Sequence, residues 1–361
     1  MNPIRLLVDS FADEGLPNAQ MANAREIICR LDPSHFHVSV FCVEDPDPRI
    51  MRRPNTRLIR LPKRRQTVRI AREFLLGKHE ILFYLKSSPA SRYYMSLRSK
   101  WKDQRVVVGT VESQADLRNE PTISPAAQRL WQQTILRCDY LFSNSSMVQK
   151  SLQREYLLPS SIIPTGVDTN FFTLGLQEKQ SVHPRVLFAG SLRPFKGPQL
   201  VLEAAKRFPS ATFALAGEGT MAAELESFVH REKLPNVEFL GLLNAERLRA
   251  EYQKADIFLF PSRWEGSPKV ILEAAACGLP VIARKDYQPE TVIDGETGYL
   301  AQSDAEIFQR LEQLLKDVPL RLTLGAAGRK HSERFDWNSI AQQWEQAFID
   351  LAPVRGRRHA A

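Results

Sequence analysis

Short apolar runs alternate along the chain with longer segments whose apolar residues recur every three or four positions. The short runs, rich in Val, Ile and Phe, are typical of strands buried on both faces of a parallel sheet, and the longer period is that of a helix packed on one face. In the first half we expect strands at residues 4–8, 37–43, 58–61, 81–84, 106–111 and 140–143, and helices at 18–31 and 128–137.

The alternation stops near residue 170 and starts again at Arg185, after a polar segment without pattern at 174–184 that we interpret as a hinge. Strands are then expected at 185–189, 212–216, 237–240, 257–260 and 281–283, and helices at 198–207, 222–232, 245–254, 268–277 and 337–351. This pattern predicts a doubly wound α/β protein with two Rossmann-like domains, residues 1–172 and 180–335, followed by a C-terminal helix at 336–352.

The composition changes this picture little. A chain of 361 residues with 43% hydrophobic and 25% charged residues fits two soluble domains, and no apolar run approaches the roughly 20 residues of a membrane span. The four cysteines have no paired spacing, so we expect reduced thiols and a cytoplasmic location.

The net charge of +8 lies entirely in the first half. Residues 52–105 alone hold 16 basic and 3 acidic residues. This basic segment is either a solvated face or a surface that attracts an anionic partner, such as lipid head groups, a phosphorylated acceptor or nucleic acid. Because aromatic residues are not interleaved as base stacking requires, we favour the inner membrane face as a peripheral site and expect no nucleic acid.

The second half contains a predicted helix start that suits an anion. Ser267 is a good N-cap and Pro268 is favoured at the first helical position, so the amides of Lys269 and Val270 would face an anion with the positive end of the helix dipole. Gly266 would let a ligand approach the backbone closely.

Two carboxylates flank this helix start. Glu273 lies six residues beyond the cap, roughly 9 Å along the axis, where it could accept hydrogen bonds from ribose hydroxyls. Glu265 precedes the cap, on the side where a sugar would lie. The alternative is an ordinary capped helix with two surface glutamates.

Arg193 and Lys196 follow the buried strand at 185–189. Ligands of open α/β sheets bind at the carboxyl ends of strands, so these two cations are placed to meet a pyrophosphate without a metal ion. The alternative is a solvated basic turn. Gly217 and Gly219 end the next strand without the third glycine of a dinucleotide fingerprint, and we expect them to let a nucleoside lie against the backbone.

Residues from about 185 to 300 resemble the C-terminal domain of retaining GT-B glycosyltransferases, specifically family 4. The matching segments are 190–197, 217–219, 239–241, 255–262, 265–281 and 295–298, and the first half resembles the family more loosely at 139–145 and 164–168. The resemblance implies two Rossmann-like domains that face a cleft, with the last helix returning to the first domain. It implies a hexosyltransferase of polysaccharide biosynthesis that moves a sugar from a nucleoside-diphosphate sugar to a glycan or lipid-linked acceptor.

The resemblance also implies roles for individual residues. Arg193 and Lys196 would bind the donor pyrophosphate, Glu273 the ribose, and Glu265 the transferred sugar. Further donor contacts are expected from Gly190, Gly217, Gly219, Gly241, Gly266, Ser267, Lys269 and Val270. No metal and no cofactor is expected, because in the proposed same-face mechanism the departing phosphate oxygen takes the acceptor proton while cations stabilise the leaving group.

Two positions depart from the family pattern. Ser191 stands where an arginine is common, which puts the reach of Arg193 in question. Glu112 stands where many members have a histidine; it would orient an acceptor hydroxyl, touch the donor sugar, or only cap a helix at the surface. Gly15 and Asn18 lie where the family has a glycine-rich loop that faces acceptor and phosphate.

Two other functions stay open on these residues. One is a non-hydrolysing sugar-nucleotide epimerase of the same fold, although the first half has no well-placed histidine for it. The other is a non-catalytic protein that binds a nucleotide sugar. Asp45 and Asp47 match the Asp-x-Asp metal signature of another glycosyltransferase fold, but they lie in a proline-rich loop that we interpret as a surface turn. The donor base, UDP or GDP type, is not readable.

Overall fold

The computed structural model describes residues 2–13, 19–101, 104–112, 124–175 and 183–353. The chain folds into two compact units. Unit 1 comprises residues 1–164 together with 337–361, and unit 2 comprises residues 165–336. None of the described helices is long and apolar enough to cross a bilayer.

Unit 1 is built on a parallel sheet of seven strands in the order β3-β2-β1-β4-β5-β6-β7. The chain order reverses between β1 and β4, so the topological switch point lies at their carboxyl ends. The strands of unit 1 are β1 (Ile4–Phe11), β2 (Phe36–Cys42), β3 (Thr56–Arg60), β4 (Ile81–Phe83), β5 (Val106–Val111), β6 (Tyr140–Ser143) and β7 (Ser161–Ile162).

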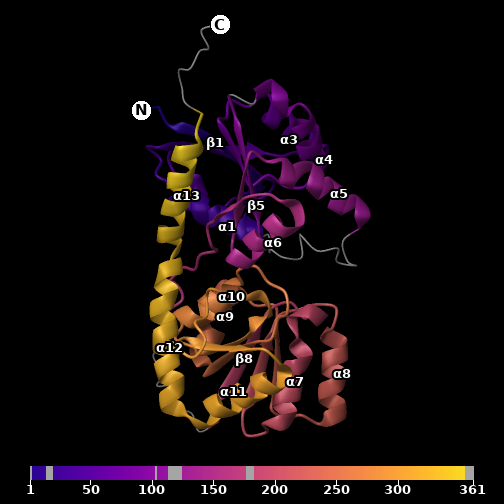
Figure 1. The fold of residues 1–361 in the computed structure, drawn as a ribbon, viewed down its shortest axis with the longest axis vertical. Coiled ribbons are helices and arrows are strands. Elements are labelled where there is room, and N and C mark those ends of the chain that lie inside the picture. The colour runs from indigo at the N-terminus through magenta and orange to yellow at the C-terminus, as the bar shows by residue number, and fades with distance from the viewer. Residues whose placement is uncertain (1, 14–18, 102–103, 113–123, 176–182, 354–361) are drawn as a thin grey trace. The chain divides into compact units, whose positions relative to one another are not determined.

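Helices cover both faces of this sheet, as expected for a doubly wound domain (Figure 1). They are α1 (Ala19–Arg30), α2 (Pro48–Arg52), α3 (Gln66–Leu76), α4 (Pro89–Ser96), η1 (Arg98–Trp101), α5 (Pro125–Thr134), η3 (Ile135–Arg137), α6 (Ser146–Tyr156) and α13 (Trp337–Leu351). The last helix is distant in sequence, yet its apolar stripe packs beside α1 in one core cluster through Ile340, Trp344 and Phe348. The predicted return of the C-terminal helix to the first domain is therefore confirmed.

Unit 2 is built on a second parallel sheet, in the order β10-β9-β8-β11-β12-β13. Its switch point lies at the carboxyl ends of β8 and β11. The strands are β8 (Arg185–Ala189), β9 (Thr212–Ala216), β10 (Val237–Gly241), β11 (Ile257–Phe260), β12 (Val281–Arg284) and β13 (Gly298–Ala301). The helices are η4 (Pro194–Lys196), α7 (Pro198–Arg207), α8 (Ala222–Glu232), α9 (Ala245–Lys254), α10 (Lys269–Ala276), η5 (Lys285–Tyr287), α11 (Asp304–Lys316), α12 (Val318–Ser332) and η6 (Glu333–Phe335).

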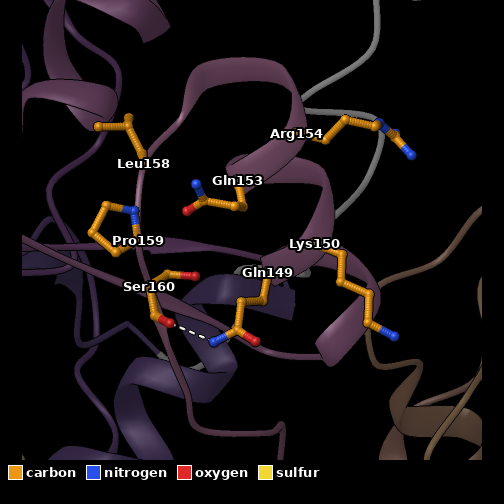
Figure 2. Close-up of a pocket in the computed structure, with 7 residues that line it drawn as sticks. All are labelled: Gln149, Lys150, Gln153, Arg154, Leu158, Pro159 and Ser160. Carbon is orange, nitrogen blue, oxygen red and sulfur yellow. Dashed lines mark hydrogen bonds between the residues drawn. The ribbon is translucent and has the colours of Figure 1, made fainter.

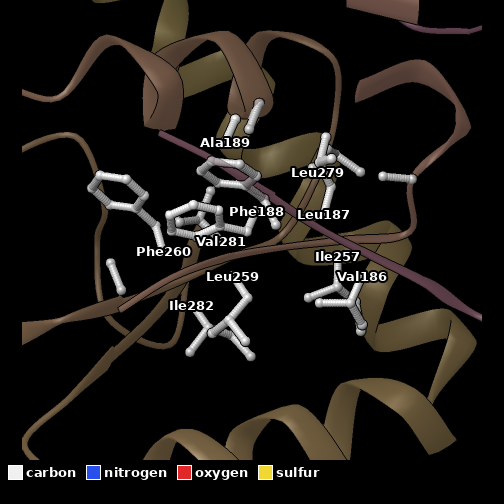
Figure 3. Close-up of a cluster of buried hydrophobic side chains, with 14 of the residues drawn as sticks. Val186, Leu187, Phe188, Ala189, Ile257, Leu259, Phe260, Leu279, Val281 and Ile282 are labelled. Atoms are coloured by element: carbon white, nitrogen blue, oxygen red, sulfur yellow. The ribbon is translucent and has the colours of Figure 1, made fainter. Parts of the chain in front are cut away.

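The core of unit 2 explains why its strands could be predicted from the sequence. Almost every side chain of β8, β11 and β12 is buried, because helices cover both faces of the sheet (Figure 3). The ring of Phe260 stacks on those of Phe188 and Phe258, with centroid distances of 6.2 and 6.0 Å, respectively. These strands are therefore continuous apolar runs and not alternating ones.

The predicted fold class is confirmed, since each domain is a Rossmann-like parallel sheet with helices. The predicted boundary between the two domains is not confirmed. Residues 165–172, which the sequence placed in the first domain, lie in unit 2. The backbone of Val167 bridges to Asp336, the Thr169 hydroxyl donates to the Asp336 carboxylate at 2.6 Å, and Phe172 is buried in the core of unit 2. The predicted hinge at 174–184 falls largely outside the described residues.

Candidate active site

Lys196 and Glu265 form an ion pair at the switch point of unit 2. Lys196 follows β8 and Glu265 follows β11; Nζ of the lysine donates to Oε1 of the glutamate. The Ser262 hydroxyl donates to the same oxygen at 2.6 Å. Only 17% and 12% of the two charged side chains are exposed, so a ligand that takes either partner meets a weakly screened charge.

Two aromatic rings hold this lysine in place. Its Nζ lies 5.3 Å from the ring centroids of Phe195 and Phe260, within the range of cation–π attraction. Arg193, the other predicted cation, is the N-cap residue of η4 and has an exposed side chain. The structure thus brings Lys196 and Glu265 together and leaves Arg193 at the rim of the same turn.

The start of α10 differs from the prediction by one residue. The helix begins at Lys269 with Pro268 as its N-cap residue, and no side chain caps it, so the predicted Ser267 cap is wrong. The reason is that Pro268 has extended ψ, 115°, and only its carbonyl joins the first turn, accepting from the Ile271 amide at 3.2 Å. The amides of Lys269 and Val270 still stand in the first turn, where the helix offers them no carbonyl.

Glu273 is held from a neighbouring helix. The Tyr252 hydroxyl, on α9, donates to Oε2 of Glu273 at 3.1 Å. Burial raises the pKa of Glu273, and the opposing effects of Lys269, four residues earlier on the same helix face, and of Tyr252 do not cancel it. The alternative of two solvated surface glutamates is therefore wrong for this helix.

The predicted glycines divide into two kinds. A Cβ on Gly217 would lie 1.9 Å from the Gly190 carbonyl oxygen, and one on Gly219 would lie 2.4 Å from the Leu192 carbonyl oxygen. The close packing of adjacent loops therefore requires glycine at both positions, and their contact with a nucleoside stays a prediction. Gly241, with φ +63°, has nothing within 4 Å of the Cβ position.

Sequence reasoning missed three residues that shape this site. Ser262 and Tyr252 orient the two glutamates, as described above. Tyr287, after β12, is fully buried, and its hydroxyl has no hydrogen-bond partner within the described parts of the chain. Burial, with the negative charges of Glu265 and Asp286, raises the pKa of Tyr287 far above its usual value. For Ser262 and Tyr287 the available signal was their position just after the strands β11 and β12, and for Tyr252, within α9, there was none.

In unit 1, Glu112 follows β5 and is partly buried. Its carboxylate accepts from the Tyr84 hydroxyl and from Nδ2 of Asn23, at 3.4 Å for the latter. Nδ2 of Asn144 donates to the Glu112 backbone carbonyl at 2.8 Å. The other two predicted acceptor-side residues, Gly15 and Asn18, lie outside the described residues.

Carboxylates elsewhere in unit 1 have structural partners. Asp47, of the Asp-x-Asp match, is buried; it caps α2 by accepting from the Arg49 amide and pairs with the Arg49 guanidinium at 2.7 Å. Asp32, His35 and Glu345 place potential ligand atoms within 4.8 Å of one another. That group flanks the amino end of β2, the edge of the sheet opposite Glu112.

A surface hollow of about 440 Å³ lies apart from these residues, on α6 and the turn that follows it (Figure 2). Gln149 donates to the Ser160 carbonyl across its floor, and Lys150 and Arg154 extend outward at its edge. None of the described residues that line it is a carboxylate or belongs to a strand end of the switch point, so we do not assign it to the reaction.

Fold and site together define a two-domain glycosyltransferase of the GT-B class. Residues 169–331 match the family model described as glycosyl transferases group 1. The D-inositol 3-phosphate glycosyltransferase of Corynebacterium diphtheriae is 31% identical over 301 residues, which cover 73% of this chain and 70% of that protein. The chain belongs to the group 1 glycosyltransferases, hexosyltransferases that use nucleotide sugars.

Solved structures agree on the fold. Sucrose-phosphate synthase from Thermosynechococcus elongatus superimposes with a TM-score of 0.80 at 22% identity, covering 97% of this chain and 99% of that one. The Anabaena protein HepE in complex with UDP-glucose superimposes with a TM-score of 0.75 at 19% identity, covering 96% of this chain and all of that one.

Proposed function

We propose that the protein is a retaining, metal-independent glycosyltransferase that moves a hexose from a nucleoside-diphosphate sugar to a glycan or lipid-linked acceptor. The observation that supports this most is the Lys196–Glu265 pair, in which Glu265 precedes the first residue of α10 by four positions. It combines a cation, a carboxylate and a helix N-terminus at the switch point of unit 2, as a diphosphate joined to a sugar requires.

In this proposal the bound donor separates the ion pair, because each of the two side chains binds a different part of the donor. The diphosphate takes the Lys196 ammonium, and the released Glu265 carboxylate, held by Ser262, accepts hydroxyls of the transferred sugar. Glu273, oriented by Tyr252, accepts from the ribose. Each charge-assisted hydrogen bond of this kind contributes roughly 1.5–3 kcal/mol.

The proposed chemistry needs no side-chain base. The bond between the anomeric carbon and the phosphate oxygen breaks while a bond to the acceptor oxygen forms on the same face of the sugar. The acceptor proton passes to the departing phosphate oxygen, so atoms and charge balance. Lys196, with Arg193 from the rim, stabilises the negative charge that develops on the leaving group.

The names of relatives support the acceptor class. Besides the inositol phosphate enzyme, a GDP-mannose-dependent phosphatidylinositol monomannoside mannosyltransferase of Mycolicibacterium smegmatis is 32% identical over 222 residues, 55% of this chain and 56% of that one. These names favour a transferase over an epimerase or a non-catalytic sensor. We further propose a cytoplasmic enzyme that associates with the inner membrane face through the basic segment 52–105.

Thermal unfolding with UDP, GDP and their sugars tests the donor site. We expect one nucleotide series to raise the melting temperature; a ligand at a hundred times its Kd adds about 2.7 kcal/mol to the stability. Lys196→Met should abolish the shift and lower kcat/KM at least tenfold, whereas Lys206→Met, an exposed lysine paired with Glu232, should change neither.

Two further measurements address the finer points. The anomeric configuration of the product, read by NMR, should match that of the donor, and a chelator should leave the rate unchanged. Inversion, or loss of activity with the chelator that a divalent cation restores, would contradict the mechanism. A full shift with Lys196→Met would contradict the donor site itself.

A further inference from the structure

A small hollow in unit 1 lies at the amino ends of its strands, the opposite end of the sheet from Glu112. This amino-end hollow measures about 160 Å³ and is lined by residues of β1, β2 and β3 and of the end of α3. Clefts that hold a whole drug-sized ligand measure roughly 300–1,000 Å³, so this one suits a single small group. The titratable residues that line it are Arg5, His37, Arg57, Glu73, Lys78 and His79.

The register of the strands brings these side chains together. Arg5 on β1 pairs with His37 on β2, and Ser39 on β2 pairs with Arg57 on β3. Because alternate residues of a strand share a face, Arg5, His37 and Arg57 belong to one face of the sheet. The core cluster of that face includes Phe74 of α3, so the end of this helix lies over the hollow.

His79 is the observation that points to a ligand. It lines the hollow and is 6% exposed, and neither ring nitrogen has a hydrogen-bond partner within the described ranges. A neutral imidazole carries one N–H donor and one acceptor nitrogen. Burial of both without a partner is unfavourable, and native proteins rarely leave such groups without protein, water or an ion beside them.

The charge around this ring favours an anion. Burial lowers the pKa of His79 to about 3, and the positive charges of Arg105, Arg5 and Arg98 lower it further. The segment 102–103, outside the described residues, carries one charge of each sign and leaves the balance unchanged. Among the described residues that line the hollow, pair with a lining residue or act on His79, the cations are Arg5, Arg57, Arg69, Lys78, Arg98 and Arg105, and the carboxylates in the same set or paired with it are Glu73, Glu80 and Asp139.

The carboxylates of this set offset only part of the positive charge. Glu73 pairs with Arg57 at 3.1 Å and with Arg69 at 3.4 Å, and Glu80 pairs with Arg5 at 3.4 Å. An excess of cations therefore remains for a ligand. The oxygens of an anion accept hydrogen bonds from guanidinium, ammonium and imidazole N–H groups alike, and such charge-assisted bonds are roughly twice as strong as neutral ones.

We propose that the amino-end hollow binds a phosphate group, whose oxygens accept hydrogen bonds from Arg57, Lys78 and the ring of His79. A phosphate dianion neutralises more of the excess positive charge than a carboxylate does. Because Arg5, Arg57 and Lys78 are exposed, the hollow is open to solvent, and the group is either free phosphate or the phosphate of a larger molecule that stays outside. The site is independent of the sugar transfer proposed above.

Melting temperatures measured against inorganic phosphate test the site. The Lys196→Met protein is used as the parent, so that the donor site lacks its buried cation. The buffer is zwitterionic, chloride holds the ionic strength constant, and phosphate stays millimolar because concentrated phosphate stabilises proteins without binding. We expect the melting temperature to rise with phosphate as the logarithm of one plus its concentration over Kd, which gives the Kd.

Variants test the residues. Lys78→Gln and Arg57→Gln should each weaken phosphate binding severalfold, and the double variant about tenfold or more. His79→Phe removes both ring nitrogens, so it should lose most of the phosphate effect without melting at a lower temperature when phosphate is absent. The control is Arg72→Gln: Arg72 is exposed on α3 and is not among the described residues that line the hollow, so its loss should leave the Kd unchanged.

Glycerol 3-phosphate and dihexanoyl phosphatidic acid, measured in the same way, distinguish the sources. Tightest binding of inorganic phosphate assigns the free ion, whereas tightest binding of one of the esters assigns a phosphorylated metabolite or a lipid head group. The proposal is overturned if none of the three raises the melting temperature beyond chloride, if Lys78→Gln and Arg57→Gln bind as tightly as the parent, or if Arg72→Gln weakens binding as much as they do.

Discussion

His79 is a residue whose environment could not be predicted from its neighbours in the chain. It follows α3, is 6% exposed, and neither ring nitrogen has a partner in the described ranges of the chain. Burial, with the positive charges of Arg105, Arg5 and Arg98, lowers its pKa to about 3. The ring is therefore neutral in the folded protein at neutral pH.

This lowered pKa has a defined effect on stability. The pKa of His79 in the folded protein lies below its unfolded value of about 6.5, so the unfolded chain binds more protons between pH 6.5 and 3. The free energy of unfolding therefore falls as the pH is lowered through that range, by up to about 1.4 kcal/mol per pH unit. His79→Phe removes the effect. Urea unfolding at pH 7, 6, 5 and 4 should show a shallower decline for the variant than for the wild type.

The same experiment shows what would contradict this interpretation. Parallel curves for the two proteins would mean that His79 protonates in the folded state or finds a partner there. His35, exposed and hydrogen-bonded to Glu345 at 2.8 Å, offers a contrast, because that contact raises its pKa. His35→Phe should therefore not flatten the decline.

At the scale of elements, the loops that end β8 and β9 are locked together by glycine. The Gly190 amide donates to the Ala216 carbonyl at 2.9 Å, and Gly217, at φ +142°, has no room for a Cβ. Gly217→Ala should cost on the order of 3 kcal/mol or more, because backbone must move. Gly241→Ala is the matched control: it meets only the strain of φ +63°, about 1 kcal/mol.

Urea unfolding monitored by circular dichroism measures both variants. Equal losses would show that the loops adjust to a side chain and that the close approach is not required. A large loss for Gly217→Ala with an intact nucleotide shift would separate the packing role of this glycine from donor binding.

The elements themselves were predictable to unequal degrees. The strands β5, β6, β8, β9 and β11 and the helices α7, α8, α9 and α13 have the predicted bounds, because each carries a clean apolar period between breakers. The short strand β13 and the helices α2, α3, α4, α6, α11 and α12 were not predicted. In α12, for example, small and basic residues occupy much of the surface and blur the apolar face.

The distribution of charge concerns the molecule as a whole. The basic excess lies in residues 1–170, and Lys63, Arg64 and Arg65 are all exposed just before α3, where Val68 and Leu76 are also exposed. A cluster of cations beside apolar side chains is typical of a surface that adsorbs to anionic lipid.

Co-sedimentation with vesicles tests the proposed membrane association. We expect binding to vesicles that contain phosphatidylglycerol and not to pure phosphatidylcholine, with release by salt. Replacing Lys63, Arg64 and Arg65 by Gln should weaken binding severalfold per residue, at about 1 kcal/mol each. Replacing the exposed Lys206, Arg231 and Lys316 of unit 2 serves as the control, and indifference to lipid charge and to salt would contradict the proposal.

The sequence alone determined that two parallel sheets would form and that cations and carboxylates would stand at particular strand and helix ends. These are local properties, since the burial of successive side chains sets the apolar period and a strand end is marked where that period stops. Tertiary structure decided which groups meet. Lys196 pairs with Glu265, Tyr252 holds Glu273, and two distant asparagines converge on Glu112, because the order of strands in a sheet, unlike their number, is a non-local property.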